Sequence, residues 1–276
     1  MHGPMRILLD SGVFSHSEFA APAVQESSVC WGDRNIVAPI HGFVRKPPDK
    51  NLEYQRQKEA LFTIGRLIRE GRIEAHVYIE ILFERMRGKG GFPVLNALKD
   101  CHIEHCSAAL DRSKFRRTGN FLETISKGGK QDRRSDVESG TATQVAFLEW
   151  LCTLRKDHVN VLIQHAAQIR LTEFEIESLR NIDWFQFLCQ RSGTPENYPD
   201  VFHLWTAERN GLHAVLTLDE RLTNLVSRVK NEKVKRIEIQ TEVLRPLDLL
   251  QKFGIGKPYS VPMNSNKFYY LNEVIQ

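Results

Sequence analysis

Aspartates stand at the ends of two apolar segments of the chain and at the start of a third element. Asp10 comes directly after the apolar residues 7–9, and Asp219 stands two residues after the apolar run 214–217. Asp200 begins the helical segment that precedes that run. Carboxylates brought together repel one another unless they are protonated or bridged by a cation. Because hard oxygen ligands suit Mg²⁺ or Mn²⁺, the three aspartates predict a divalent metal site.

Each aspartate also has a purely structural interpretation. Asp10, followed by Ser11 and Gly12, suits a turn that ends a strand. Asp200 and Asp219 suit the first turn of a helix, where the helix dipole favours a negative charge. Taken singly, each residue fits its structural role better, but their joint occurrence around successive strand ends favours the metal site.

Apolar periodicity divides the chain into alternating strands and helices. Strands are predicted at residues 6–9, 73–79, 214–217 and 234–240, and helices at residues 52–69, 81–86, 199–210 and 247–253. Several further helices are predicted between residues 143 and 190, whereas residues 11–50, rich in Gly, Pro and Ser, are predicted as mostly loop. The alternation predicts an α/β fold with a mainly parallel sheet covered on both faces. In such sheets ligands bind beyond the carboxyl ends of the strands.

Three stretches of the chain resemble the PIN-domain nucleases. Residues 200–219 form an aspartate-headed helix followed by a strand that ends in Thr-x-Asp, which is similar to the carboxyl-terminal motif of that family. Residues 7–11 resemble its first strand, with a metal-binding aspartate and an adjacent hydroxyl. Residues 237–250 resemble its last strand and helix, so the three stretches occur in the expected order.

The resemblance implies a fold and an activity. The fold is a PIN-like three-layer α/β/α core made of residues 1–106 and 180–256, with a basic loop and helical insertion at 107–179 and a tail at 257–276. The activity is metal-dependent hydrolysis of phosphodiester bonds by an endoribonuclease, on single-stranded RNA in preference to DNA. The cofactor is Mg²⁺ or Mn²⁺, and in two-metal sites of this kind the ions lie about 3.5–4 Å apart.

The PIN family also has an acidic residue on the helix after the second strand. Glu84 fits that place in this chain, and Glu80 lies four residues earlier on the same helical face. The resemblance favours Glu84 as a metal ligand or as the group that orients the attacking water, and leaves Glu80 as the alternative.

The remaining site roles follow from the same resemblance. Asp10, Asp200 and Asp219 are expected to be metal ligands. The hydroxyls of Ser11 and Thr217 are expected to hydrogen-bond those ligands or the attacking water.

A basic segment lies in the middle of the chain, between about residues 107 and 142. Lys114, Arg116 and Arg117 surround Phe115 there, an arrangement that suits contact with a nucleic-acid backbone and stacking on one base. A solvated loop without a ligand explains the same composition equally well, and the sequence does not separate the two.

Metal binding by cysteine and histidine is not expected. Residues 101–106 hold two cysteines, two histidines and one glutamate, but in a strand His102 and Cys106 face one side while Cys101 and His105 face the other. All five cysteines are therefore predicted to be free thiols. His203 is predicted to be a packed or surface histidine.

Composition limits the class of protein. With 276 residues and 41% hydrophobic content, the chain can bury a large core, and a net charge of +4 means that any nucleic-acid site must be local. No apolar run approaches the roughly 20 residues that span a bilayer, and no secretory signal is recognised. The sequence therefore predicts a cytoplasmic protein without membrane association.

Two other functions remain open. A PIN-like module without catalysis would bind RNA or a protein partner through the same surface. A phosphatase with an aspartyl nucleophile fits less well, because Gly12 stands where the second aspartate of an Asp-x-Asp motif is needed. An inhibitory protein partner and a homodimer through residues 143–190 are further expectations.

Overall fold

A computed structural model describes residues 3–87, 96–115, 135–231, 238–265, 267–270 and 273. Its centre is a five-stranded sheet in which every neighbouring pair of strands is parallel. The strands, in spatial order, are β5 (Ile103–His105), β4 (Ile73–Val77), β1 (Met5–Leu9), β6 (Ala214–Leu216) and β7 (Glu242–Leu244). The predicted α/β fold with a mainly parallel sheet is confirmed. The carboxyl ends of all five strands meet at one edge.

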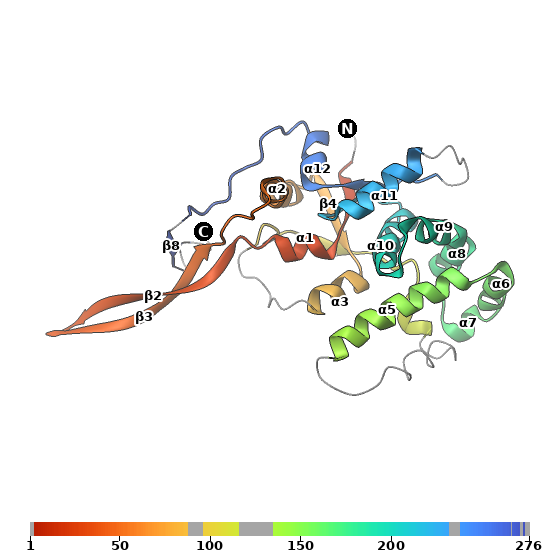
Figure 1. Cartoon of the computed structure of the whole chain (residues 1–276), viewed down its shortest axis with the longest axis horizontal. Coiled ribbons are helices and arrows are strands. Elements are labelled where there is room, and N and C mark those ends of the chain that lie inside the picture. The colour runs from red at the N-terminus through yellow and green to blue at the C-terminus, as the bar shows by residue number, and fades with distance from the viewer. Residues whose placement is uncertain are drawn as a thin grey trace.

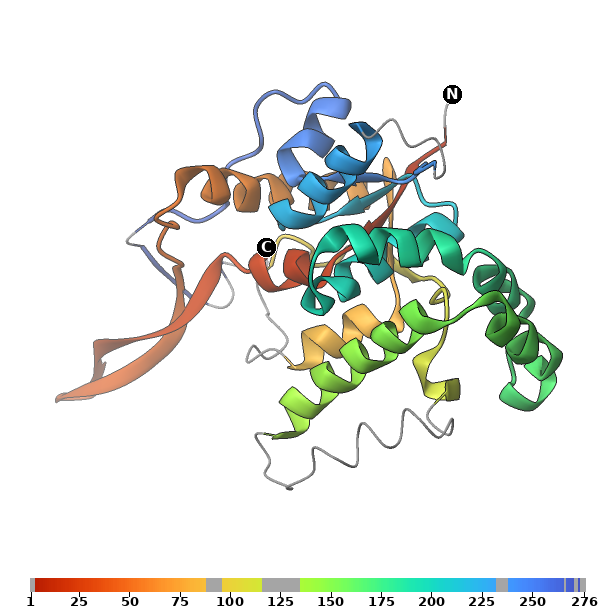
Figure 2. The same ribbon diagram turned by 45° about the vertical axis from the view of Figure 1, so that its right-hand side comes forward.

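Helices flank this sheet (Figure 1). α2 (Leu52–Arg69) packs against β4 and against α12 (Pro246–Lys252), while α10 (Tyr198–Arg209) packs against β1 and β6. Figure 2 shows α2 and α12 on one side of the sheet and α10 on the other, an arrangement consistent with three layers. The remaining helices near the site are α1 (Ser11–His16), α3 (Ile79–Arg87) and α11 (Glu220–Asn231).

Local sequence accounts for the limits of α2, which match the prediction. The Asn51 side chain accepts a hydrogen bond from the backbone N–H of Tyr54 at 3.1 Å and caps the amino terminus. Leu61, Ile64 and Ile68 form the buried stripe of an amphipathic helix. Gly71, with φ of +69°, ends the helical path where a side chain would be strained.

Helices from the middle of the chain extend the core beyond α10. They are α5 (Ser135–Thr153), α6 (Lys156–Gln164), α7 (Ala166–Ile169), α8 (Glu173–Arg180) and α9 (Ile182–Ser192), with the short helices η1 (Arg112–Phe115) and η2 (Pro195–Asn197). The ring of Phe185 in α9 lies 5.0 Å from the Trp205 ring and 5.9 Å from the Phe202 ring, both in α10. One buried cluster includes these residues and the sheet, so the several predicted helices share the core of the sheet. The boundaries between core, insertion and tail that were expected near residues 106, 179 and 256 stay a prediction.

The prediction of loop for residues 11–50 is wrong. This segment contains α1 and two long strands, β2 (Ala20–Trp31) and β3 (Arg34–Arg45), which pair antiparallel along their whole length. The hairpin projects away from the central sheet (Figure 1) and is joined at its base by β8 (Phe268–Tyr269). Backbone hydrogen bonds hold this ribbon without burying a complete face, since Val24 and Val37 are 60% and 64% exposed. The alternation that marks a half-buried strand is therefore missing from its sequence.

The position predicted for the last strand of the sheet is also wrong. Residues 238–240 are not in a strand, residues 232–237 lie outside the described part of the chain, and the strand that pairs with β6 is Glu242–Leu244. Ile237 and Ile239 suggested a strand by their alternation. The register with β6 instead selects Val243 and Leu244, whose side chains enter the core.

Within the described residues, no helix combines the length and the apolar character needed to cross a bilayer.

Candidate metal centre

Asp10 stands at the carboxyl end of β1, beside the adjacent strand β6. Its backbone N–H donates to Leu216 O at 3.0 Å, which continues the pairing of the two strands. The Thr217 hydroxyl donates to Asp10 Oδ2 at 2.7 Å, and the Ser11 hydroxyl lies 3.4 Å from Asp10 Oδ1. The hydroxyls of Ser11 and Thr217, which were expected to hydrogen-bond the metal ligands or the attacking water, therefore both contact the Asp10 carboxylate.

Asp219 follows β6 and precedes α11. Its backbone N–H donates to Thr217 Oγ1 at 3.0 Å, so one hydroxyl connects the positions of both aspartates. Its Oδ1 accepts the backbone N–H of Arg221 at 2.7 Å, as a residue that caps a helix does. Asp219 therefore both caps α11 and lies at the carboxyl edge of the sheet.

Glu84 and His203 complete a cluster with Asp10. Each of the three side chains offers a ligand atom, and these atoms all lie within 4.8 Å of one another. His203 Nε2 lies 3.3 Å from Glu84 Oε1, and His203 Nδ1 lies 2.7 Å from the Tyr78 hydroxyl. The Gln144 amide donates to Glu84 Oε1 at 2.9 Å. The imidazole is 2% exposed, so the cluster has a buried, oriented nitrogen on one side.

Asp200 lies in the first turn of α10, three residues before His203. Burial raises the pKa of Asp200 to about 7, and the charges of Asp10, Asp219 and Glu84 add to the rise while His203 opposes it. These carboxylates are therefore close enough to disfavour one another's ionisation. A bound cation would relieve that repulsion.

His203 and Glu84 each shift the pKa of the other in the direction that favours an ion pair between them. Burial acts to raise the pKa of Glu84, but the charge of His203 and hydrogen bonds lower it to about 2. Burial likewise acts to lower the pKa of His203, and the charge of Glu84 outweighs it and raises the value to about 9. Glu84 is consequently ionised at neutral pH.

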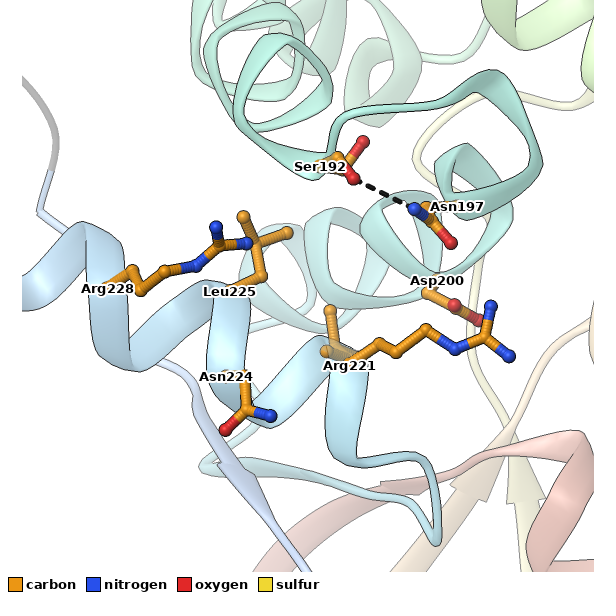
Figure 3. Close-up of a pocket in the computed structure, with 8 residues that line it drawn as sticks. Ser192, Asn197, Asp200, Arg221, Asn224, Leu225 and Arg228 are labelled. Atoms are coloured by element: carbon orange, nitrogen blue, oxygen red, sulfur yellow. Dashed lines mark hydrogen bonds between the residues drawn. The ribbon is translucent and has the colours of Figure 1, made fainter.

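Two hollows adjoin this centre. One, of about 510 Å³, is lined by Asp10, Asp200 and Asp219 together with residues of α1, α2 and α11. The other, of about 350 Å³, lies between α9, α10 and α11 (Figure 3). Asp200 and Arg221 line both hollows, and Arg228 extends the second along α11. Figure 3 shows the Arg221 side chain reaching toward Asp200.

Glu80, the alternative acidic residue of α3, forms an ion pair away from the metal centre. Its two carboxylate oxygens each accept a hydrogen bond at 3.0 Å from the guanidinium of Arg112, and both side chains are buried. Glu80 therefore anchors η1 to α3. Glu84 is the one of the two that the structure places beside Asp10.

The predicted nucleic-acid contacts are only partly within the described residues, and those that are have internal partners. Lys114 Nζ lies 2.5 Å from Glu175 Oε2. Phe115 is 0% exposed and packs against Phe147 and Trp150 with ring centroids 5.7 and 5.4 Å apart, so it offers no face for a base to stack on. Arg116 and Arg117 lie outside the described residues.

The place of His203 was missed at the sequence level. It was predicted as packed or surface, and it is indeed buried, yet its Nε2 faces Glu84. The spacing from Asp200 held a usable signal, because residues three apart on a helix share a face. The five cysteines are free, as predicted.

Comparison with known proteins adds no relative to this geometry: no protein-family model, no curated protein and no solved structure matches the chain.

Proposed function

We propose that this protein is a metal-dependent nuclease that hydrolyses phosphodiester bonds, with single-stranded RNA as the preferred substrate. The observation that carries the proposal is the convergence of Asp10, Glu84 and His203 within 4.8 Å, beside Asp200 and Asp219, at the carboxyl edge of a parallel sheet. The PIN-like assignment belongs to the same proposal, since it rests on the motifs of residues 7–11 and 200–219 and on the helix that contains residues 246–250.

The donor set fits a divalent cation. The carboxylates of Asp10, Glu84, Asp200 and Asp219 suit Mn²⁺ or Mg²⁺, and burial and the neighbouring acids raise the pKa of Asp200 as expected of crowded carboxylates. A cation bound there would polarise a phosphoryl oxygen and lower the pKa of a water molecule. Thr217 and Ser11 hold the Asp10 carboxylate in one orientation for this purpose.

Glu84 and Asp200 suit different tasks. His203 keeps Glu84 ionised, so Glu84 is available as a ligand or to orient water at any physiological pH. Asp200 gains and loses its proton near neutrality in the absence of metal, and cation binding would displace that proton.

A polyanionic substrate is supported by the neighbouring hollow. Arg221, Asn224 and Arg228 line it along α11, and guanidinium groups are well suited to phosphate oxygens. The hollow adjoins the metal centre through Asp200, so a chain bound there would extend toward the carboxylates. The choice of RNA over DNA rests on the resemblance to PIN-domain nucleases alone.

The test is cleavage of labelled single-stranded RNA and DNA of mixed sequence, with Mn²⁺, with Mg²⁺ and with EDTA. We expect metal-dependent cutting that Asp10→Asn, Glu84→Gln and Asp219→Asn each reduce by about 10- to 100-fold or more, because loss of a group that only orients a metal ligand already has an effect of that size. Asp183→Asn, an exposed first-turn aspartate of α9, is the matched control and should cut like the wild type.

Other results would point elsewhere. Cutting that survives the three substitutions would place the active site at other residues. No cutting by the folded wild type with either metal would favour the alternative, a PIN-like module that binds RNA or a protein without catalysis.

A further inference from the structure

A second group of ligating side chains lies on β4 and β5 and shares no residue with the centre at Asp10. Glu74 and His76 are two residues apart on β4, so they face the same side of the sheet. Glu104 of β5 is the register partner of His76. One ligand atom from each of the three lies within 4.8 Å of the other two.

His76 is buried in a way that hydrogen bonding does not fully explain. The residue is 3% exposed, and its Nε2 lies 2.7 Å from Glu74 Oε1. Its Nδ1 is buried without a hydrogen-bond partner among the described residues. Most buried polar atoms in proteins have a partner, so a histidine placed here for packing alone is unusual.

The charges around this histidine favour a cation. Arg6 Nε lies 3.1 Å from Glu74 Oε1, and Glu104 adds a second carboxylate to the group. Burial acts to raise the pKa of Glu74, but hydrogen bonds from His76 and Arg6 keep it below its usual value.

A fourth donor stands within reach. His102 lies two residues before Glu104, so both face the same side of the chain, and its Nε2 is 3.7 Å from Glu104 Oε1. The side chains of His102 and Glu104 are 86% and 48% exposed and are free to turn. The two histidines and two glutamates together make the nitrogen and oxygen set that zinc accepts.

We propose that Glu74, His76 and Glu104, with His102 as a fourth ligand, bind Zn²⁺ or a similar divalent transition metal. Tetrahedral ligands at zinc distances stand about 3.3 Å apart, so the group must tighten by small rotations of its exposed members. Arg6, whose side chain is 40% exposed, would turn toward solvent or toward the other oxygen of Glu74. The imidazole ligands favour zinc over Mg²⁺.

The ion would join the edge strand to the sheet. β5 has three residues and pairs only with β4 among the described strands, so its attachment is short. Ligands on both strands would cross-link them, and a metal that binds only the folded state raises stability. The expected role is structural and does not depend on nuclease activity.

The first test is zinc stoichiometry by equilibrium dialysis and elemental analysis, in an Asp10→Asn/Glu84→Gln background that disables the other centre. We expect one zinc ion per chain in this background, lost when Glu104→Gln is added and kept when His105→Gln is added. His105 is exposed and lies on the opposite face of β5, which makes it the matched control. Absence of zinc in this background, or zinc binding that ignores Glu104→Gln, overturns the proposal.

Comparison of the wild-type chain with Glu104→Gln alone gives a result that does not depend on the folding of the Asp10→Asn/Glu84→Gln variant. Zinc content should differ by one ion between wild type and Glu104→Gln, while Mn²⁺-dependent cleavage stays the same in both. Cobalt absorption gives a second readout: Co²⁺ added to the wild type should show bands that Glu74→Gln removes. Equal zinc content and equal cobalt spectra in wild type and variants would mean that Glu74, His76 and Arg6 are an ordinary ion-pair network.

Discussion

The Nε2 atom of His203 lies 3.3 Å from Oε1 of Glu84, and this contact joins α10 to α3 at the carboxyl edge of the sheet. The other ring nitrogen lies 2.7 Å from the Tyr78 hydroxyl, which fixes the orientation of the imidazole. His203 therefore holds one acid of the proposed metal centre in place and keeps it ionised, although burial acts in the opposite direction on the pKa of Glu84.

Replacement of this histidine should weaken metal binding without unfolding the protein. His203→Gln retains a polar group but removes the imidazole that lies between Tyr78 and Glu84 and orients the Glu84 carboxylate. We expect the Kd for Mn²⁺ to rise about 10- to 100-fold, the usual effect of losing a group that orients a ligand. Isothermal titration calorimetry measures it, with His165→Gln on the exposed end of α6 as the control. An unchanged Kd would show that His203 only fills space.

Thr217 should matter for stability as well as for the site. Its hydroxyl donates to Asp10 Oδ2 and accepts the backbone N–H of Asp219, and the residue is 1% exposed. Thr217→Val keeps the shape but leaves both partners unsatisfied, which should lower the free energy of unfolding by about 1–3 kcal/mol. Thr217→Ser keeps the hydroxyl and should cost less. Urea denaturation compares the two, and equal losses would argue against the hydrogen bonds as the cause.

Stability of the metal-free protein should fall as pH rises from about 4 to about 7 through Asp200. Burial raises its pKa from 3.8 to about 7, so the folded state binds a proton that the unfolded state releases. Asp200→Asn removes this dependence. Its advantage over wild type should be absent near pH 4 and reach about 2 kcal/mol near pH 8, roughly half of what the shift alone implies because the site is partly solvated.

Denaturation in EDTA at several pH values measures this difference. Excess Mn²⁺ should reverse the order near pH 8, because the cation stabilises only the chain that keeps its ligand. A stability difference between wild type and Asp200→Asn that stays constant with pH would mean that Asp200 is ionised throughout this pH range.

Substitutions of Glu80 and Glu84 should differ in their effects on stability and on metal affinity. Glu80→Gln removes one partner of the buried pair with Arg112 and should lower the free energy of unfolding by about 3–5 kcal/mol. The Mn²⁺ affinity of the folded fraction should not change. Glu84→Gln should do the reverse, with a large loss of affinity and a smaller loss of stability. Calorimetry measures the Mn²⁺ affinity of both variants, and urea denaturation measures their stability. Reduced affinity in Glu80→Gln would indicate that Glu80 is the acidic residue of α3 that binds the metal.

The arginines of α11 should contribute to RNA binding without taking part in the chemistry. Arg221→Ala and Arg228→Ala should each weaken binding of a single-stranded oligonucleotide and lower the slope of log K against log salt by about 1. Fluorescence anisotropy in EDTA avoids cleavage during the measurement. Lys230→Ala, an exposed cation on the same helix that does not line the hollow, is the control. Equal effects of all three would indicate only general charge attraction.

The amino-acid sequence by itself determined the features that depend on neighbouring residues. The limits of α2 follow from the Asn51 cap, an apolar stripe and Gly71, and the placing of Asp10 and Asp219 follows from short apolar strands that end in polar residues. A parallel sheet brings such strand ends together, so the carboxylate edge was predictable as well.

Only the tertiary structure decided what depends on contacts between distant segments. Glu80 and Glu84 share a helical face and differ only in meeting Arg112 or His203, far along the chain. The β2–β3 ribbon is held by backbone pairing, to which side-chain periodicity gives no guide. The group of Glu74, His76 and Glu104 likewise needs the register between β4 and β5, and a register is a property of two strands that neither strand's sequence contains.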